Sequence, residues 1–176
     1  MPTDSPASPL PEYETLAAAL RVVLSRHDAA RGYDELVIRL GLAGAVVAVP
    51  GECIGTWHTY ARDAALPAAA SALGLRLREL HPPSAAVGLQ GSPEFAVHFT
   101  DSYVPLIRRA CEAGQCCLAW RGWPTPHELS WGVLTGVTDE RPHGISPAGE
   151  DVALTAPAWQ VYVVEDHNPQ AAARGF

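Results

Sequence analysis

Apolar residues recur every three or four positions along the first part of the chain, which is the period of a helix with one buried face. We expect a first helix over residues 13–26, where this spacing is carried by Leu16, Ala19, Leu20, Val23 and Leu24. A second helix is expected over residues 33–40, because Asp34 suits its N-cap and Gly41 suits its end. The chain therefore begins with helices.

Two more helical stretches follow. The first covers residues 56–73, and Pro67 within it must break the helix, kink it or begin a second segment. The other is expected over residues 102–113, closed by Gly114. Between them, residues 84–99 contain Gly and show no clear period, so we expect a loop with at most one strand at its end.

Five segments show strand patterns, and three of them lie beyond residue 115. A β-branched run at residues 44–49 reads as a buried strand, and residues 75–80 alternate apolar and polar side chains. Three later segments, residues 116–120, 131–136 and 160–164, are separated by Gly, Pro and Asp turns. Because helices come first and most strands later, the sequence predicts an α+β fold with N-terminal helices packed on a largely antiparallel sheet.

The length of 176 residues and the 48% hydrophobic content fit one domain with an ordinary core. We place this domain at residues 13–166. Residues 1–12 carry four Pro and neither a basic cluster nor an apolar run, so we expect a disordered tail without an export signal. Residues 167–176 are expected to form a loose C-terminal tail.

The charge and the cysteines limit the classes of partner. With 19 acidic and 12 basic residues the formal charge is −7, which disfavours nucleic acid and anionic membranes. The longest apolar runs, such as residues 40–49, are too short to span a bilayer. We therefore expect a soluble cytoplasmic protein in which the four cysteines are free thiols: Cys53, Cys111, Cys116 and Cys117.

Neither a cofactor nor a metal is expected. Residues 41–44 contain two Gly but are expected to lead into a strand, so the chain has no phosphate-binding loop that opens a helix. Zinc would need thiolates that converge on one point. Cys116 and Cys117 are adjacent on a predicted strand, so their side chains point to opposite faces.

Four short motifs occur in a suggestive order at residues 33–36, 42–44, 112–115 and 131–136. Together they resemble the papain-like domains related to bacteriocin leader peptidases and to the N-terminal part of butirosin-biosynthesis protein H. The resemblance covers roughly residues 12–166. In active members a catalytic Cys begins the first helix, and a His directly precedes an aromatic-Gly-aliphatic-aliphatic-Thr-Gly strand.

This chain departs from that pattern at both reactive positions. Glu14 and Thr15 occupy the start of the first helix, and Ser130 precedes Trp131. A hydroxyl without a base is a poor nucleophile near neutral pH. The resemblance therefore implies a catalytically degenerate domain that binds a small molecule or peptide in the cleft between helices and sheet, a cleft lined by Trp123, Ser130 and Trp131.

A different alignment of the chain with the papain-like motifs gives a second hypothesis, in which the protein is an active enzyme. Cys53 follows Pro50-Gly51-Glu52 and precedes a predicted helix, an environment that activates a thiol. His127 would then be the base, oriented by Glu128 or Asp139, in a cysteine-dependent hydrolase or acyltransferase. The ordinary alternative makes Cys53 a small buried residue and His127 a loop residue. A third hypothesis is a structural module that oligomerises.

Four tryptophans gather late in the chain: Trp120, Trp123, Trp131 and Trp159. Such a cluster is able to stack on a flat or aliphatic ligand, with Arg121 pairing an acidic group. The interpretation that we favour is that strand tryptophans fill the core beneath the helices, with Trp123 as the exception that faces the cleft.

Overall fold

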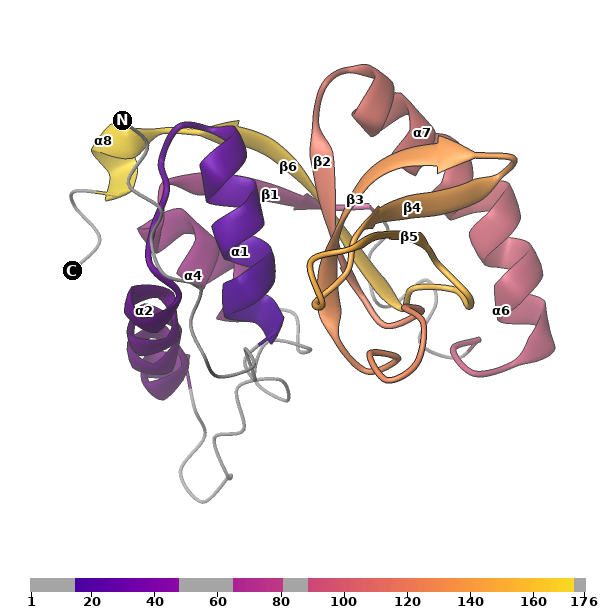
Figure 1. Ribbon diagram of the computed structural model, residues 1–176, viewed down its shortest axis with the longest axis horizontal. Coiled ribbons are helices and arrows are strands. Elements are labelled where there is room, and N and C mark those ends of the chain that lie inside the picture. The colour runs from indigo at the N-terminus through magenta and orange to yellow at the C-terminus, as the bar shows by residue number, and fades with distance from the viewer. Residues whose placement is uncertain (1–14, 48–64, 81–88, 173–176) are drawn as a thin grey trace.

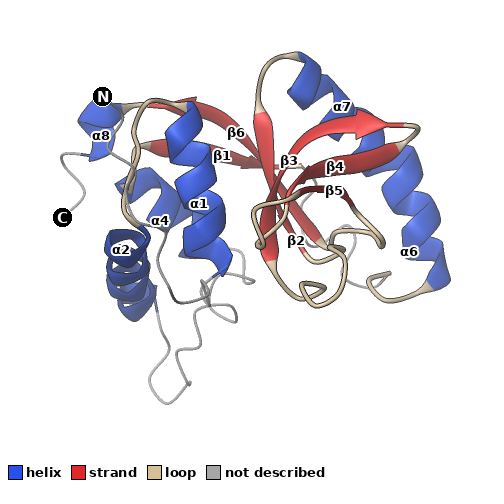
Figure 2. Cartoon of the chain, in the orientation of Figure 1, coloured by secondary structure: helices blue, strands red, loops and turns tan. Residues whose placement is uncertain are grey.

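The structure, a computed structural model, describes residues 15–47, 65–80 and 89–172. One six-stranded antiparallel sheet with strand order β1-β6-β2-β3-β4-β5 forms its centre (Figures 1 and 2). The strands are β1 (Leu75–Glu79), β2 (Cys116–Trp120), β3 (Trp131–Thr138), β4 (Arg141–Ile145), β5 (Asp151–Ala153) and β6 (Gln160–His167). The expected α+β class with an antiparallel sheet is confirmed.

Helices cover both faces of this sheet. They are α1 (Thr15–Arg26), α2 (Tyr33–Val47), α4 (Ala65–Ala72), α6 (Pro93–His98), the π-helical η1 (Phe99–Tyr103), α7 (Val104–Glu112) and α8 (Pro169–Ala172). Strand β3 contacts α1 on one face and α7 on the other (Figure 1). Within the described ranges, none of these helices has the length and hydropathy to cross a bilayer.

Two hydrophobic cores result, one on each face of the sheet. Because side chains alternate along a strand, Cys116 and Leu118 of β2 pack toward α1, whereas Cys117 and Ala119 pack toward α7. With both faces covered, the centre of the sheet reads as a continuous apolar run, and residues 161–164 of β6 are all buried. The core on the α1 side reaches the end of the sheet where β2 ends and β3 begins.

The strand expected at residues 44–49 is wrong, because α2 continues through Gly41 to Val47. Helix α2 packs against α1 and α4, and this tertiary packing outweighs the strand propensity of a short β-branched run. The stretch expected over residues 56–73 begins outside the described residues. Its described part is α4, and Pro67 lies in the first turn, where no backbone N–H is needed.

The loop expected at residues 84–99 is wrong at its end. Ser92 has an extended backbone, Pro93 opens α6, and the helix runs without a break through η1 into α7. Gly114, with φ +80°, then closes it as expected, and its N–H donates to the carbonyl of Cys111 at 2.9 Å. The π-helical segment η1 has more residues per turn than an α-helix, so side chains four residues apart stay on the side that faces the sheet. These side chains are all buried: Phe95, Phe99, Tyr103 and Ile107.

The sheet extends further than predicted on two sides. Strands β4 and β5 were not expected, and the hairpin turn before β4 is made by Asp139 and Glu140, both with positive φ. On the other side of the sheet, β6 reaches His167 beside the edge strand β1, and α8 packs on α4. The loose tail expected from residue 167 is therefore wrong as far as residue 172, while the tail expected at residues 1–12 lies outside the described residues.

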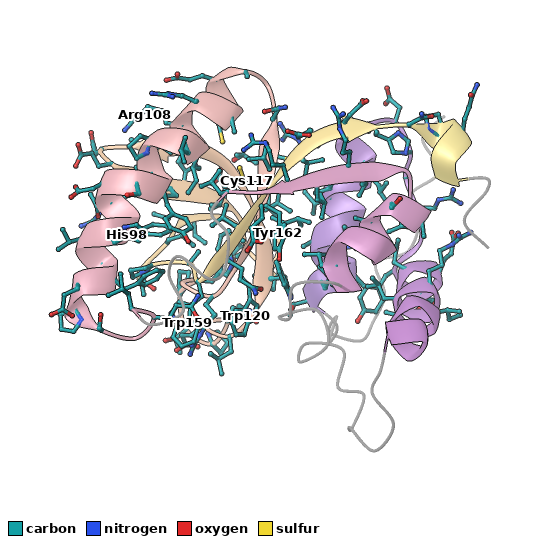
Figure 3. The ribbon with its side chains drawn as sticks, turned by 180° about the vertical axis from the view of Figure 1, so that it is seen from behind. His98, Arg108, Cys117, Trp120, Trp159 and Tyr162 are labelled. Carbon is teal, nitrogen blue, oxygen red and sulfur yellow. The ribbon has the colours of Figure 1, made fainter. Side chains whose placement is uncertain are left out.

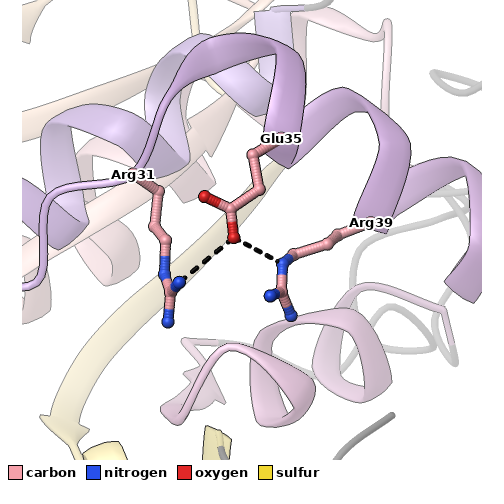
Figure 4. Close-up of polar contacts among 3 residues, drawn as sticks. All are labelled: Arg31, Glu35 and Arg39. Carbon is pink, nitrogen blue, oxygen red and sulfur yellow. Dashed lines mark hydrogen bonds and ion pairs between the residues drawn. The ribbon is translucent and has the colours of Figure 1, made fainter.

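Surface charges reinforce α2 (Figure 4). The Oε1 atom of Glu35 accepts hydrogen bonds from Arg31 at 3.1 Å and from Arg39 at 2.9 Å. Each pair is four residues apart and partly exposed, so each stabilises the helix by only about 0.3–0.5 kcal/mol.

Candidate functional site at the aromatic end of the sheet

The start of α1 meets the start of β3. The backbone N–H of Trp131 donates a hydrogen bond to the Oγ1 atom of Thr15 at 3.0 Å. Thr15 is the first residue of α1, and Ser130, 8% exposed, directly precedes β3. The two positions that the resemblance assigns to nucleophile and base are thus adjacent in space.

Their side chains limit the chemistry at this junction. Both residues carry a hydroxyl, and Thr15 already accepts the hydrogen bond from Trp131. A hydroxyl titrates far above neutral pH, so Ser130 cannot take a proton from Thr15 in the way that an imidazole takes one from a thiol. These two residues alone do not make a nucleophile.

The alternative catalytic set is only partly described. His127 lies in the β2–β3 loop, where its N–H donates to the carbonyl of Pro124 at 2.8 Å. Asp139 follows the far end of β3, a strand of 8 residues, which separates it from the Ser130 end by about 25 Å. Asp139 therefore cannot orient His127 if His127 acts at the Ser130 end, and Cys53 lies outside the described residues.

Aromatic rings line the α1-facing side of this end of the sheet. Trp120 pairs in register with Trp131, and their ring centroids are 6.5 Å apart. Tyr162 lies 6.3 Å from Trp131, and Trp159 lies 6.0 Å from Trp120 in an edge-to-face arrangement. Figure 3 shows Trp120 and Trp159 side by side at the tip of the sheet, with Tyr162 further in. Trp120 and Trp159 are half-buried, so this end of the cluster reaches solvent.

Trp123 takes a different position from the one expected. It is fully buried in the α7-side core, and its Nε1 atom donates to the carbonyl of Ala119 at 3.3 Å. Its ring lies so close over Gly132 that a Cβ atom at that position would overlap it. Trp123 is therefore a core residue, and the expectation that it faces a cleft is wrong. The members of the cluster that reach solvent are Trp120 and Trp159, which are half-buried.

Trp131 and Ser130 lie beneath the surface. Trp131 is fully buried and Ser130 nearly so, which makes them the floor of this end of the sheet and not its rim. A small cavity of about 30 Å³, bordered by Trp131, Ala18 and Ser146, separates α1 from β3 and β4 and has room for a single water molecule. A ligand must therefore bind against the outer rings.

Arg121 stands at the rim of the cluster. Its guanidinium carbon lies 3.7 Å from the centre of the Trp159 ring and 5.4 Å from that of Trp120. Its backbone has φ +71°, and its N–H donates to the carbonyl of Ser130 at 3.0 Å. Partial burial lowers the pKa of the guanidinium.

Part of this site was visible in the sequence. The four tryptophans and Arg121 stood out in the sequence because they lie close together. The side of the sheet on which each of these side chains lies depends on the turn after β2. That turn has positive φ at both Arg121 and Gly122, which a residue list alone does not show. Trp159 was hard to assign because it lies just before β6, where strand alternation does not apply.

Comparison of the chain with protein-family models, with curated proteins and with solved structures found no match. The function must therefore be argued from the geometry of the site.

Proposed function

We propose that this chain is a papain-like domain without peptidase activity, which binds a small molecule or a peptide against the aromatic end of its sheet. The proposal depends on one observation above all. The hydrogen bond from Trp131 to Thr15 brings together the start of α1 and the start of β3, the two segments that carry Cys and His in active papain-like domains.

The residues at this junction favour binding over catalysis. Thr15 and Ser130 replace a thiol and an imidazole, and without those groups the covalent step of a cysteine peptidase has neither its nucleophile nor its base. The packing of α1 on β3 holds these two segments together and does not depend on a reactive pair.

The rings at the rim favour a ligand with an apolar or flat body. Trp120 and Trp159 present half-exposed indoles held edge to face, and Arg121 adds one polar group beside them. Ligand sites commonly combine aromatic walls with a few fixed polar groups. Tyr and Trp rings also bury a large area on binding, because few rotatable bonds are lost.

A cytoplasmic location belongs to the same proposal. The three described cysteines, Cys111, Cys116 and Cys117, are free thiols. Free thiols persist in a reducing compartment.

Screening the whole chain with small molecules and short peptides tests the proposal. A ligand that binds only the folded state raises the melting temperature, and binding beside Trp120 and Trp159 changes tryptophan emission. We expect ligands that do both with the wild type and with Val97→Ala, a change at an exposed position on α6, but not with Trp120→Leu.

Two results would contradict the proposal. Peptide hydrolysis that iodoacetamide abolishes, with Cys53 as the labelled residue, would support the cysteine-dependent enzyme instead. A melting temperature that depends on protein concentration and responds to no ligand would support the oligomerising module.

A further inference from the structure

Among the described residues, no carboxylate forms an ion pair with the guanidinium of Arg121. The ion pairs in this part of the chain involve other arginines and His143, whereas Arg121 contacts the rings of Trp159 and Trp120 and forms a hydrogen bond through its own backbone. Burial shifts its pKa downward. The indole faces of Trp159 and Trp120 offset part of this loss of hydration, and an anion bound beside them would offset more of it.

The position of this charge is fixed from several directions. The carbonyl of Gly122, the next residue, accepts the N–H of Thr155 at 2.8 Å, which anchors the turn. A Cβ atom on Gly122 would overlap the carbonyl of Ala156, so the turn depends on glycine.

The ring below the charge is fixed as well. The N–H of Trp159 donates to the carbonyl of Trp120 at 3.0 Å, and the Nε2 atom of Gln90 donates to the carbonyl of Trp159 at 3.1 Å. Arg121 is therefore presented on a built platform and does not extend freely into solvent. Little side-chain freedom remains to be lost when a ligand binds.

The guanidinium of Arg121 contacts the Trp159 ring through its flat face, which leaves the N–H groups at its edge available to a ligand. The five N–H donors of an arginine lie in the plane of the group, so contact with the Trp159 ring does not satisfy them. Two parallel donors match the two oxygens of a carboxylate. One guanidinium neutralises one charge, and the formal charge of −7 on the chain disfavours ligands with several negative charges.

We infer that the ligand of the proposed site is an organic monoanion, whose carboxylate binds the edge of Arg121 while its apolar body packs on Trp120 and Trp159. This inference rests on the proposed function. The carboxylate belongs either to a small organic acid or to the C-terminus of a peptide, and the two sources present the same group to Arg121.

Two pairs of probes of matched shape test the inference by titration calorimetry. The first pair is 3-phenylpropionate and 3-phenylpropanamide, and the second is N-acetyl-Ala-Ala-Phe with a free or an amidated C-terminus. We expect the acid to bind at least about tenfold more tightly than its amide in at least one pair, since a hydrogen bond between two charged groups is stronger than one to a neutral amide. The pair with the larger preference identifies the source of the carboxylate.

Variants of Arg121 complete the test. Arg121→Asn removes the charge and tolerates the left-handed backbone, so it should abolish the preference for the acid. Arg121→Lys keeps the positive charge but lacks the planar pair of N–H donors. This variant should retain only part of the preference for the acid over the amide. Arg108→Gln, on α7 at the opposite end of the sheet in Figure 3, is the matched control and should bind like the wild type.

The outcomes separate the two proposals. Equal binding of acid and amide, or an unchanged preference in Arg121→Asn, overturns the anion assignment and leaves the binding site standing. If none of the four probes binds at millimolar concentration or changes tryptophan emission, both the site and its ligand class are overturned.

Discussion

The N–H of Trp131 donates to the Oγ1 atom of Thr15 at 3.0 Å, and the two residues are 116 positions apart in the chain. One end of this bond is the first residue of α1, and the other is the first residue of β3. It therefore ties the helical half of the molecule to the sheet at the end where the aromatic rings gather.

Removing this tie should lower the stability of the fold. Thr15→Val keeps the shape of the side chain but leaves the N–H of Trp131 without its acceptor, and we expect a loss of about 1–2 kcal/mol in the free energy of unfolding. Thr15→Ser keeps the oxygen and should lose much less. Urea denaturation monitored by tryptophan emission measures both, and an equal loss in the two variants would show that the hydrogen bond is not what matters.

Introducing a Cys–His pair at positions 15 and 130 tests the proposed papain-like alignment directly. In a Thr15→Cys variant we expect a thiol of ordinary reactivity. Adding Ser130→His should lower the pKa of that thiol, because an adjacent imidazolium stabilises the thiolate. The pH dependence of iodoacetamide labelling at position 15 measures the change. If the midpoint is the same with and without the histidine, the two positions do not form the expected dyad.

The described thiols should differ in reactivity. A hydrogen bond from Cys117 lowers the pKa of Cys111, whereas burial raises the pKa of Cys116 to about 11. Alkylation requires the thiolate, so the labelling rate of Cys111 should rise at lower pH than that of Cys116. Mass spectrometry of peptides from pH-jump labelling gives each rate separately.

Variants at Cys117 test the cause of this difference. Cys117→Ala removes the donor and should move the Cys111 midpoint to higher pH. Cys117→Ser keeps a hydrogen-bond donor and should move it less. An unshifted midpoint in Cys117→Ala would mean that the thiol of Cys117 does not stabilise the Cys111 thiolate.

The β3–β4 hairpin offers a stabilising substitution. Asp139 and Glu140 have φ of 47° and 61°, a backbone that favours glycine at such turns. We expect Glu140→Gly to raise the free energy of unfolding by about 1 kcal/mol through relief of left-handed strain. Glu150→Gly, at an exposed position without positive φ, should instead lower it, and thermal melts of the two variants give the comparison. Equal losses in both would contradict this account.

Side-chain periodicity predicted most of the sheet but missed β4 and β5 at one edge. The first helix, β1, β2, β3 and β6 follow patterns that the chain shows plainly, because burial on one or both faces imposes them. Strand β4 carries Pro142 and Gly144, which suggest a turn, and only pairing with β3 makes it a strand. A Cβ atom on Gly144 would overlap the backbone of β3, so glycine is needed there for close approach.

The candidate site shows the same division. The papain-like motifs drew attention to the segments at Thr15 and Ser130, and the hydrogen bond from Trp131 to Thr15 joins these segments. The papain-like relationship itself stays a prediction. The direction of each tryptophan did not follow, since it depends on which side of β2 and β3 each ring lies. Trp120 and Trp123 are three residues apart, yet they pack on opposite faces of the sheet.

The π turn η1 makes the long helix sensitive to its length. In an α-helix, side chains four residues apart drift around the axis by about 40° per step. The wider turn between Phe99 and Tyr103 offsets this drift, so the four-residue ladder from Phe95 to Ile107 keeps facing the sheet. Deleting a single residue there would rotate Phe95 out of the interior without altering any other amino acid. Over evolution, this stretch should accept exchanges of side chains far more readily than insertions or deletions.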